Sequence, residues 1–161
     1  MNYLTHQLLN AEEINFIKKE LEKDNQDWED GKNTAGSHAS KVKNNLQLKR
    51  TSEVSKKLSL QIKQKILNND LIKSFTLPKH IHGIMFTKSL KRMGYGRHID
   101  NAYMSSGRAD LSFTIFLSEK SQYEGGELLI ENLTSESQFK LNSGEIIIYP
   151  STYLHAVKEI L

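Results

Sequence analysis

The sequence of 161 residues contains no cysteine, which excludes a disulfide framework and any metal site built from thiolate ligands. It has only two prolines and nine glycines, and it contains no internal repeat and no low-complexity segment. No run approaches the roughly 20 apolar residues that a membrane span requires, and no basic start precedes an apolar stretch at the N-terminus. We therefore expect a cytoplasmic protein with no membrane partner.

The excess of charge of one sign is also small, because the formal net charge is only +3. Many of the lysines lie between Lys41 and Lys65, where we interpret them as a solvated face. A nucleic-acid site would need a denser basic patch, so no nucleic-acid partner is expected. The length predicts one domain, residues 1–161, with enough chain to bury a core.

Two helices are expected in the N-terminal third. Asn10 can cap the first, with Glu13 completing an Asn version of the capping box. Its apolar residues recur at helical spacing: Ile14, Ile17 and Leu21. The second runs from about Ser52 to Leu67 and has one apolar face: Val54, Leu58, Ile62 and Ile66. The polar segment 24–40 between them is expected to be a loop or irregular edge.

After Pro78 the apolar period becomes that of strands. The expected strands are 84–87, 111–117, 127–131, 137–141 and 145–149. Helices followed by short strands indicate an α+β fold. We predict a double-stranded β-helix (jelly roll) of residues 79–161, braced by two N-terminal helices within residues 1–75.

The strand at 111–117 alternates cleanly between two faces. The large apolar face is expected to pack under the helices: Leu111, Phe113, Ile115 and Leu117. The mixed face is expected to line the mouth of the barrel: Ser112, Thr114 and Phe116.

The most informative pattern is His98-Ile99-Asp100, followed much later by His155. Residues i and i+2 of an extended segment share a face, so His98 and Asp100 can point into one cavity. Two imidazoles and one carboxylate form the facial triad of non-haem Fe(II) oxygenases, which leaves half of the metal open. The alternative is that the three are unrelated: a surface histidine, a turn carboxylate and a histidine at the core edge.

The stretch 93–157 resembles the Fe(II)/2-oxoglutarate oxygenases of the prolyl 4-hydroxylase superfamily, and within them the bacterial PKHD-type hydroxylases. The matching segments are Tyr95-Gly96-Arg97-His98-Ile99-Asp100-Asn101, Arg108-Ala109-Asp110-Leu111-Ser112, Phe116-Leu117-Ser118, Tyr123-Glu124-Gly125-Gly126-Glu127-Leu128, Tyr149-Pro150-Ser151 and Leu154-His155-Ala156-Val157. Upstream, Val42-Lys43-Asn44-Asn45-Leu46-Gln47 is similar to a Lys-Asn-Asn-x-Gln segment of the same family.

The resemblance implies an enzyme that holds Fe(II) with His98, Asp100 and His155. It implies 2-oxoglutarate as cosubstrate, L-ascorbate as reductant, and release of succinate and carbon dioxide as a C–H bond is hydroxylated. The substrate would be peptidyl proline or a small molecule with a similar aliphatic group. By position, the cosubstrate pocket would be lined by Thr114, Phe116 and Leu128.

Two departures from the family pattern qualify this expectation. Ser89 stands where the family usually has a tyrosine that touches the cosubstrate. The sequence also stops at Leu161, before the family's Arg or Lys that pairs with the far carboxylate of 2-oxoglutarate, and Lys158 lies too near His155 to replace it. We therefore expect one or more final strands to be missing, and the resulting free edge favours a homodimer.

Several alternatives follow from the second departure. The chain is either a fragment or a naturally short protein that recruits another cation, such as Arg97 or Arg108. A rival hypothesis is a non-catalytic metal-binding jelly roll that has lost the carboxylate clamp. A third is a cupin-like binder of a sugar or metabolite without iron.

Overall fold

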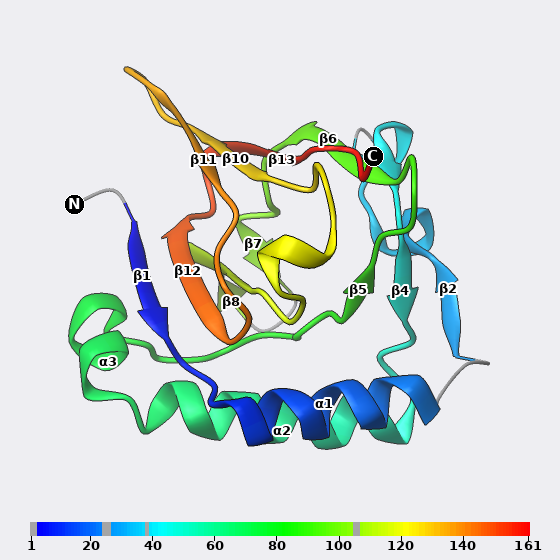
Figure 1. The fold of residues 1–161 in the computed structure, drawn as a ribbon. Helices are drawn as coiled ribbons and strands as arrows, with labels where there is room; N and C mark the ends of the chain where they lie inside the picture. The colour runs from blue at the N-terminus through cyan, green and yellow to red at the C-terminus, as the bar shows by residue number, and fades with distance from the viewer. Residues whose placement is uncertain (1–2, 24–26, 38, 105–106) are drawn as a thin grey trace.

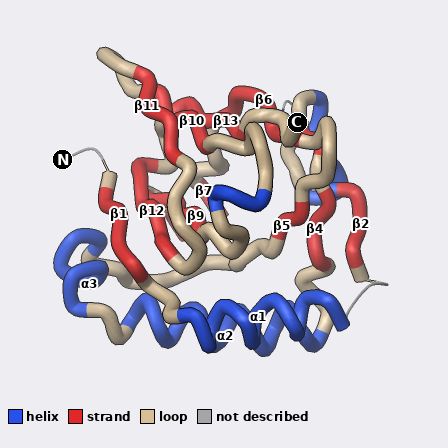
Figure 2. Tube along the Cα trace, in the orientation of Figure 1, coloured by secondary structure: helices blue, strands red, loops and turns tan. Residues whose placement is uncertain are grey.

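The structure is a computed structural model that describes residues 3–23, 27–37, 39–104 and 107–161. Three helices lie along one side of the molecule, and the strands stack above them (Figures 1 and 2). The helices are α1 (Ala11–Lys23), α2 (Glu53–Leu67) and α3 (Asp70–Thr76). Short 3-10 turns are η1 (Gly31–Thr34), η2 (Ala39–Lys41) and η3 (Lys120–Gln122). The helix and strand content confirms a mixed fold of helices and antiparallel sheets.

The strands form sheets in which every described pair is antiparallel. A three-stranded sheet has the order β1 (Leu4–Gln7), β12 (Glu145–Pro150), β9 (Leu111–Ile115). A five-stranded sheet has the order β11 (Glu136–Phe139), β10 (Leu128–Glu131), β13 (Leu154–Val157), β6 (Gly94–His98), β3 (Lys43–Asn44). A smaller sheet joins β2 (Trp28–Asp30), β4 (Leu46–Leu48) and β5 (Thr87–Lys88), and a hairpin joins β7 (Tyr103–Met104) and β8 (Gly107–Arg108).

The first predicted helix begins at its predicted cap, and the second begins at about the predicted residue. The Asn10 side chain accepts a hydrogen bond from the Glu13 amide at 2.9 Å, and the Glu13 carboxylate accepts one from the Asn10 amide at 2.8 Å. Ser52 caps α2 by accepting from the Ser55 amide. The third helix, α3, was not expected, although Asn69 caps it in the same manner.

Buried apolar residues form two clusters on either side of the central strand β12. The cluster between the helices and the three-stranded sheet includes Ile146 and Ile148. The cluster between the two large sheets consists of Phe116, Leu128, Ile130, Ile147 and Tyr149. A strand that is covered on both faces must be apolar throughout, which explains the uninterrupted run in β12.

Some predicted elements differ from those observed. Within the predicted strand 84–87 only Thr87 joins a strand, so the prediction is wrong for most of this range. Ile84 and Phe86 are nevertheless buried in the helix-side cluster. The polar segment 24–40 contains β2 and η1, while positions 24–26 and 38 lie outside the described residues. On β9, Leu111 is exposed, whereas Phe113 packs against the helix-side cluster as predicted.

An ion pair joins α1 to α2 and predicts a pH-dependent stability. The Glu20 carboxylate accepts hydrogen bonds from Lys23 at 2.6 Å and Lys57 at 3.0 Å, which hold the pKa of Glu20 below its ordinary value of 4.5. A lowered folded-state pKa stabilises the fold above the unfolded value and loses that contribution as the pH falls. Glu20→Gln should therefore lower the Tm at pH 7 but have little effect at pH 3, whereas Glu22→Gln, at an exposed position, should change neither. Equal Tm losses at both pH values would contradict this.

Candidate metal centre

Strand pairing brings two distant histidines together. His98, at the end of β6, lies opposite His155 on β13, and the next registered pair is Tyr95 with Val157. β6 therefore has one more residue than β13 between these pairs, which is a β-bulge. The bulge places Tyr95 and His98 on one face although they are three positions apart, and their rings stack with centroids 3.6 Å apart.

Asp100 completes the cluster from the segment that follows β6. Its Oδ1 lies 3.8 Å from Nε2 of His98 and 3.6 Å from Nε2 of His155. Potential ligand atoms of the three residues all lie within 4.8 Å of one another. Donors bound at right angles to a metal at about 2.1 Å are about 3 Å apart, so the two distances from Asp100 exceed the coordinating distance by less than about 1 Å.

Hydrogen bonds fix which atom of each residue faces the centre. Nδ1 of His98 lies 2.8 Å from the carbonyl of Gly96, and Nδ1 of His155 lies 2.9 Å from the carbonyl of Tyr153. A ring nitrogen that faces a carbonyl must carry the proton, so Nε2 keeps its lone pair for a metal. Ser112 donates to Oδ2 of Asp100, which leaves Oδ1 free. The donor set therefore fits a divalent cation.

The centre is closed on the histidine side and open on the carboxylate side. The side chains of His98 and His155 are 7% and 5% exposed, whereas that of Asp100 is 39% exposed. Burial lowers the pKa of His98, with a further contribution from His155, which favours the neutral imidazole that a metal needs. The ring of Tyr149 meets His155 edge-on at 5.2 Å, and burial raises the pKa of Tyr149.

Comparison with known proteins identifies the family. The sequence model of the 2OG-Fe(II) oxygenase superfamily matches residues 84–161. A PKHD-type hydroxylase of Prochlorococcus marinus strain MIT 9301 is 71% identical over 161 residues, which are 99% of this chain and 72% of that protein. The chain belongs to the PKHD-type hydroxylases. A further PKHD-type hydroxylase, from strain NATL1A, is 53% identical over 160 residues, with the same coverage.

Solved structures share the fold of this PKHD-type hydroxylase. A prolyl-4-hydroxylase of Pseudomonas putida matches with a TM-score of 0.69 at 15% identity, covering 99% of this chain and 85% of that one. A Trichoplax adhaerens prolyl hydroxylase in complex with a hypoxia-inducible-factor peptide matches with a TM-score of 0.70 at 15% identity, covering 99% and 78%. Family membership makes the protein an Fe(II)- and 2-oxoglutarate-dependent dioxygenase.

The residues expected to line the cosubstrate pocket lie in the cluster between the two large sheets. Phe116 and Leu128 are buried there with Tyr149, and the side chain of Thr114 hydrogen-bonds that of Tyr149. Leu128 lies on the same face of β10 as Ile130, whose registered partner is His155. The three expected residues therefore occupy the layer beside the metal centre, while their contact with 2-oxoglutarate stays a prediction.

The cations suggested as substitutes for the carboxylate clamp already have acidic partners. Arg97 pairs with Glu131 and with Glu136, whose Oε2 is 2.6 Å away, and Arg108 pairs with Asp110. Both arginines are exposed.

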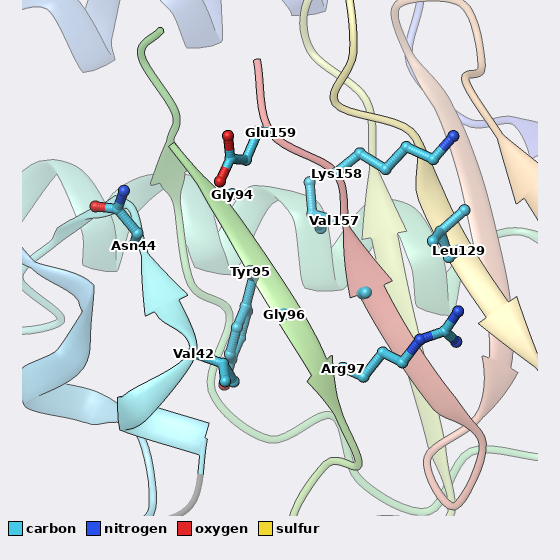
Figure 3. Close-up of a pocket in the computed structure, with 11 residues that line it drawn as sticks. Val42, Asn44, Gly94, Tyr95, Gly96, Arg97, Leu129, Val157, Lys158 and Glu159 are labelled. Atoms are coloured by element: carbon cyan, nitrogen blue, oxygen red, sulfur yellow. The ribbon is translucent and has the colours of Figure 1, made fainter. Parts of the chain in front are cut away.

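A shallow cavity of about 320 Å³ lies on the other face of the five-stranded sheet (Figure 3). It is lined by Leu129 and Ala156, which alternate along their strands with Ile130 and His155 and so face away from the metal centre. Arg97 of β6 and Lys158, which follows β13, lie on the side of Leu129 (Figure 3). This cavity is separate from the candidate site.

Two residues beside the centre were given no role by sequence reasoning, Tyr95 and Lys43, whereas Ser112 lies on the face that was expected to line the mouth of the barrel. Lys43 belongs to the upstream segment noted for its resemblance, yet only strand pairing brings it near His98. Burial lowers the pKa of Lys43, and the nearby Arg50 adds to the effect. No helix among the described residues is long and apolar enough to cross a membrane.

Proposed function

We propose that His98, Asp100 and His155 hold the Fe(II) of this dioxygenase. The observation that carries the proposal is the convergence of the three side chains within 4.8 Å, with Nδ1 of each imidazole turned to a backbone carbonyl. Three ligands on one face leave the other positions of an octahedral metal for cosubstrate and oxygen. Ser112 orients Asp100, and Tyr95 and Tyr149 fix the planes of the two imidazoles.

When bound, Fe(II) and 2-oxoglutarate supply the oxidising chemistry, with succinate and carbon dioxide as products. The chain's own residues bind and orient the metal and the cosubstrate, and they exclude water. Thr114, Phe116 and Leu128 form the wall of the cosubstrate pocket, where an apolar lining keeps water from the reacting atoms. L-Ascorbate serves as the reductant that keeps the metal active.

The substrate we propose is a prolyl residue or a similar aliphatic group. Two matched folds belong to prolyl hydroxylases, one of them in complex with a peptide. Two apolar side chains that neighbour Asp100 in the sequence are exposed, because Ile99 is 60% exposed and Tyr103 is 67% exposed.

We propose that residues 1–161 form one domain with a double-stranded β-helix at its centre. The support is that the three-stranded and five-stranded sheets enclose one apolar cluster, and that both are antiparallel. β1 and β3 bring residues from the N-terminal part of the chain into these sheets. A homodimer, a cytoplasmic location and the lack of nucleic-acid binding stay predictions.

The test is a titration under anaerobic conditions, followed by an assay. We expect the Fe(II)-loaded protein to bind 2-oxoglutarate and to form succinate, with turnover that requires both the metal and oxygen. Calorimetry measures the binding, and succinate is measured directly by mass spectrometry. Metal binding with no affinity for 2-oxoglutarate would instead support the non-catalytic metal-binding protein.

A further inference from the structure

Lys43 is a buried lysine close to the metal centre. The residue is only 3% exposed, and the hydrogen bond found for its ammonium group is to the hydroxyl of Thr34 at 3.2 Å. Among the described residues, no carboxylate lies within the 4.0 Å of an ion pair. Arg97 and Arg108, the cations suggested as substitutes for the carboxylate clamp, both have acidic partners.

Strand pairing places Lys43 in the row of Tyr95, next to the row of the first histidine of the centre. Lys43 on β3 is registered with Tyr95 on β6, so the two side chains share a face. The ammonium lies 5.1 Å from the centroid of the Tyr95 ring, and that ring stacks on His98 at 3.6 Å. One aromatic ring therefore links the cation to a residue of the metal centre.

Asp100 and Asp30 act on the Lys43 ammonium only from beyond ion-pair distance. A charged ammonium buried with no carboxylate in contact is costly, and buried charges in proteins are normally paired or bound to a ligand. A hydroxyl and the face of an aromatic ring compensate only part of the lost hydration. Apolar residues of similar volume would stabilise such a position better than lysine does. An anion that arrives from outside the protein accounts for a cation at this site.

Resting on the proposed function, we propose that Lys43 binds a carboxylate group of the hydroxylation substrate. Across the five-stranded sheet the order is β10, β13, β6, β3, so Lys43 lies beyond His98, on the side away from Leu128. The residues expected around 2-oxoglutarate, including Phe116 and Leu128, lie on the opposite side, next to His155 and Tyr149. The carboxylate at Lys43 therefore belongs to the substrate and not to the cosubstrate.

The test uses small probes on protein loaded with Mn(II) and 2-oxoglutarate. N-acetyl-L-proline is compared with N-acetyl-L-prolinamide, and N-acetylglycine with N-acetylglycinamide, by the paramagnetic broadening of the probe's proton resonances. A charge-assisted contact predicts that at least one acid binds about tenfold or more tightly than its amide. Lys43→Met should abolish that preference, whereas Lys41→Met, at an exposed lysine of the same segment, should retain it.

A stability measurement separates ligand binding from a structural role. Removing an unpaired buried charge should raise the Tm of the free Lys43→Met protein by about 2–4 °C. A lower Tm would indicate that the fold needs the ammonium and would overturn the proposal. If Lys43→Met fails to fold, both measurements are repeated with Lys43→Gln, whose side chain has a similar length.

The remaining outcomes are equally decisive. The assignment is overturned if neither acid binds more tightly than its amide. It is also overturned if Lys43→Met binds the acid with the same preference as the wild-type protein. A tenfold loss of 2-oxoglutarate affinity in Lys43→Met would assign the lysine to the cosubstrate and also overturn it. Failure of the proposed function itself would be visible separately, because the wild-type protein would then bind no 2-oxoglutarate.

Discussion

Replacing His98 by alanine is expected to weaken Fe(II) binding by more than about 100-fold and to abolish succinate formation. Loss of an outer-shell partner of a metal ligand alone costs 10–100-fold, so loss of a ligand must exceed that range. His98 also cannot be replaced by a neighbouring histidine, because His155 already occupies the adjacent position of the centre. Anaerobic calorimetry with Fe(II), or with Mn(II) as a stable substitute, measures the affinity.

The matched control is His80→Ala, which removes an exposed imidazole outside the cluster. We expect it to keep wild-type metal affinity and turnover. Thermal unfolding of both variants without metal checks that the loss is not caused by misfolding. Unchanged turnover in His98→Ala would refute the assignment of the metal centre.

Local sequence signals predicted the parts of this fold that depend on neighbouring residues. The cap at Asn10 depends on a residue three positions away, and the alternation in 111–117 depends on a period of two. His98 and Asp100 could be grouped for the same reason, since two residues of an extended segment share a face. Their union with His155 rested on resemblance to a family, because the sequence contains no signal for which strands pair.

The residues that sequence reasoning missed are brought to the site by long-range pairing. Tyr95 reaches the face of His98 only through a bulge, and strict alternation would have placed it on the opposite face. Lys43 reads as one more surface lysine until β3 is paired with β6. Pairing register and bulges are decided by the packing of the whole sheet, so they are not readable from a short segment.

Two adjacent isoleucines on β12 test how the core supports the metal centre. Ile146 and Ile147 are both fully buried, but Ile146 faces the helix-side cluster and Ile147 faces the cluster that contains Tyr149. Replacement by alanine should lower the free energy of unfolding by about 2–5 kcal/mol at either position, through lost burial and a residual cavity. Denaturant unfolding of the metal-free proteins measures this loss.

The two variants should differ in metal binding. A cavity at Ile147 loosens the layer in which Tyr149 meets the ring of His155, so Ile147→Ala should weaken Fe(II) affinity several-fold. Ile146→Ala leaves that layer intact and should retain the affinity once the protein is folded. Because the two substitutions remove the same atoms from the same strand, a difference in affinity must come from the face that each side chain occupies. Equal affinities in the two variants would mean that His155 is held by its backbone hydrogen bond and strand pairing alone.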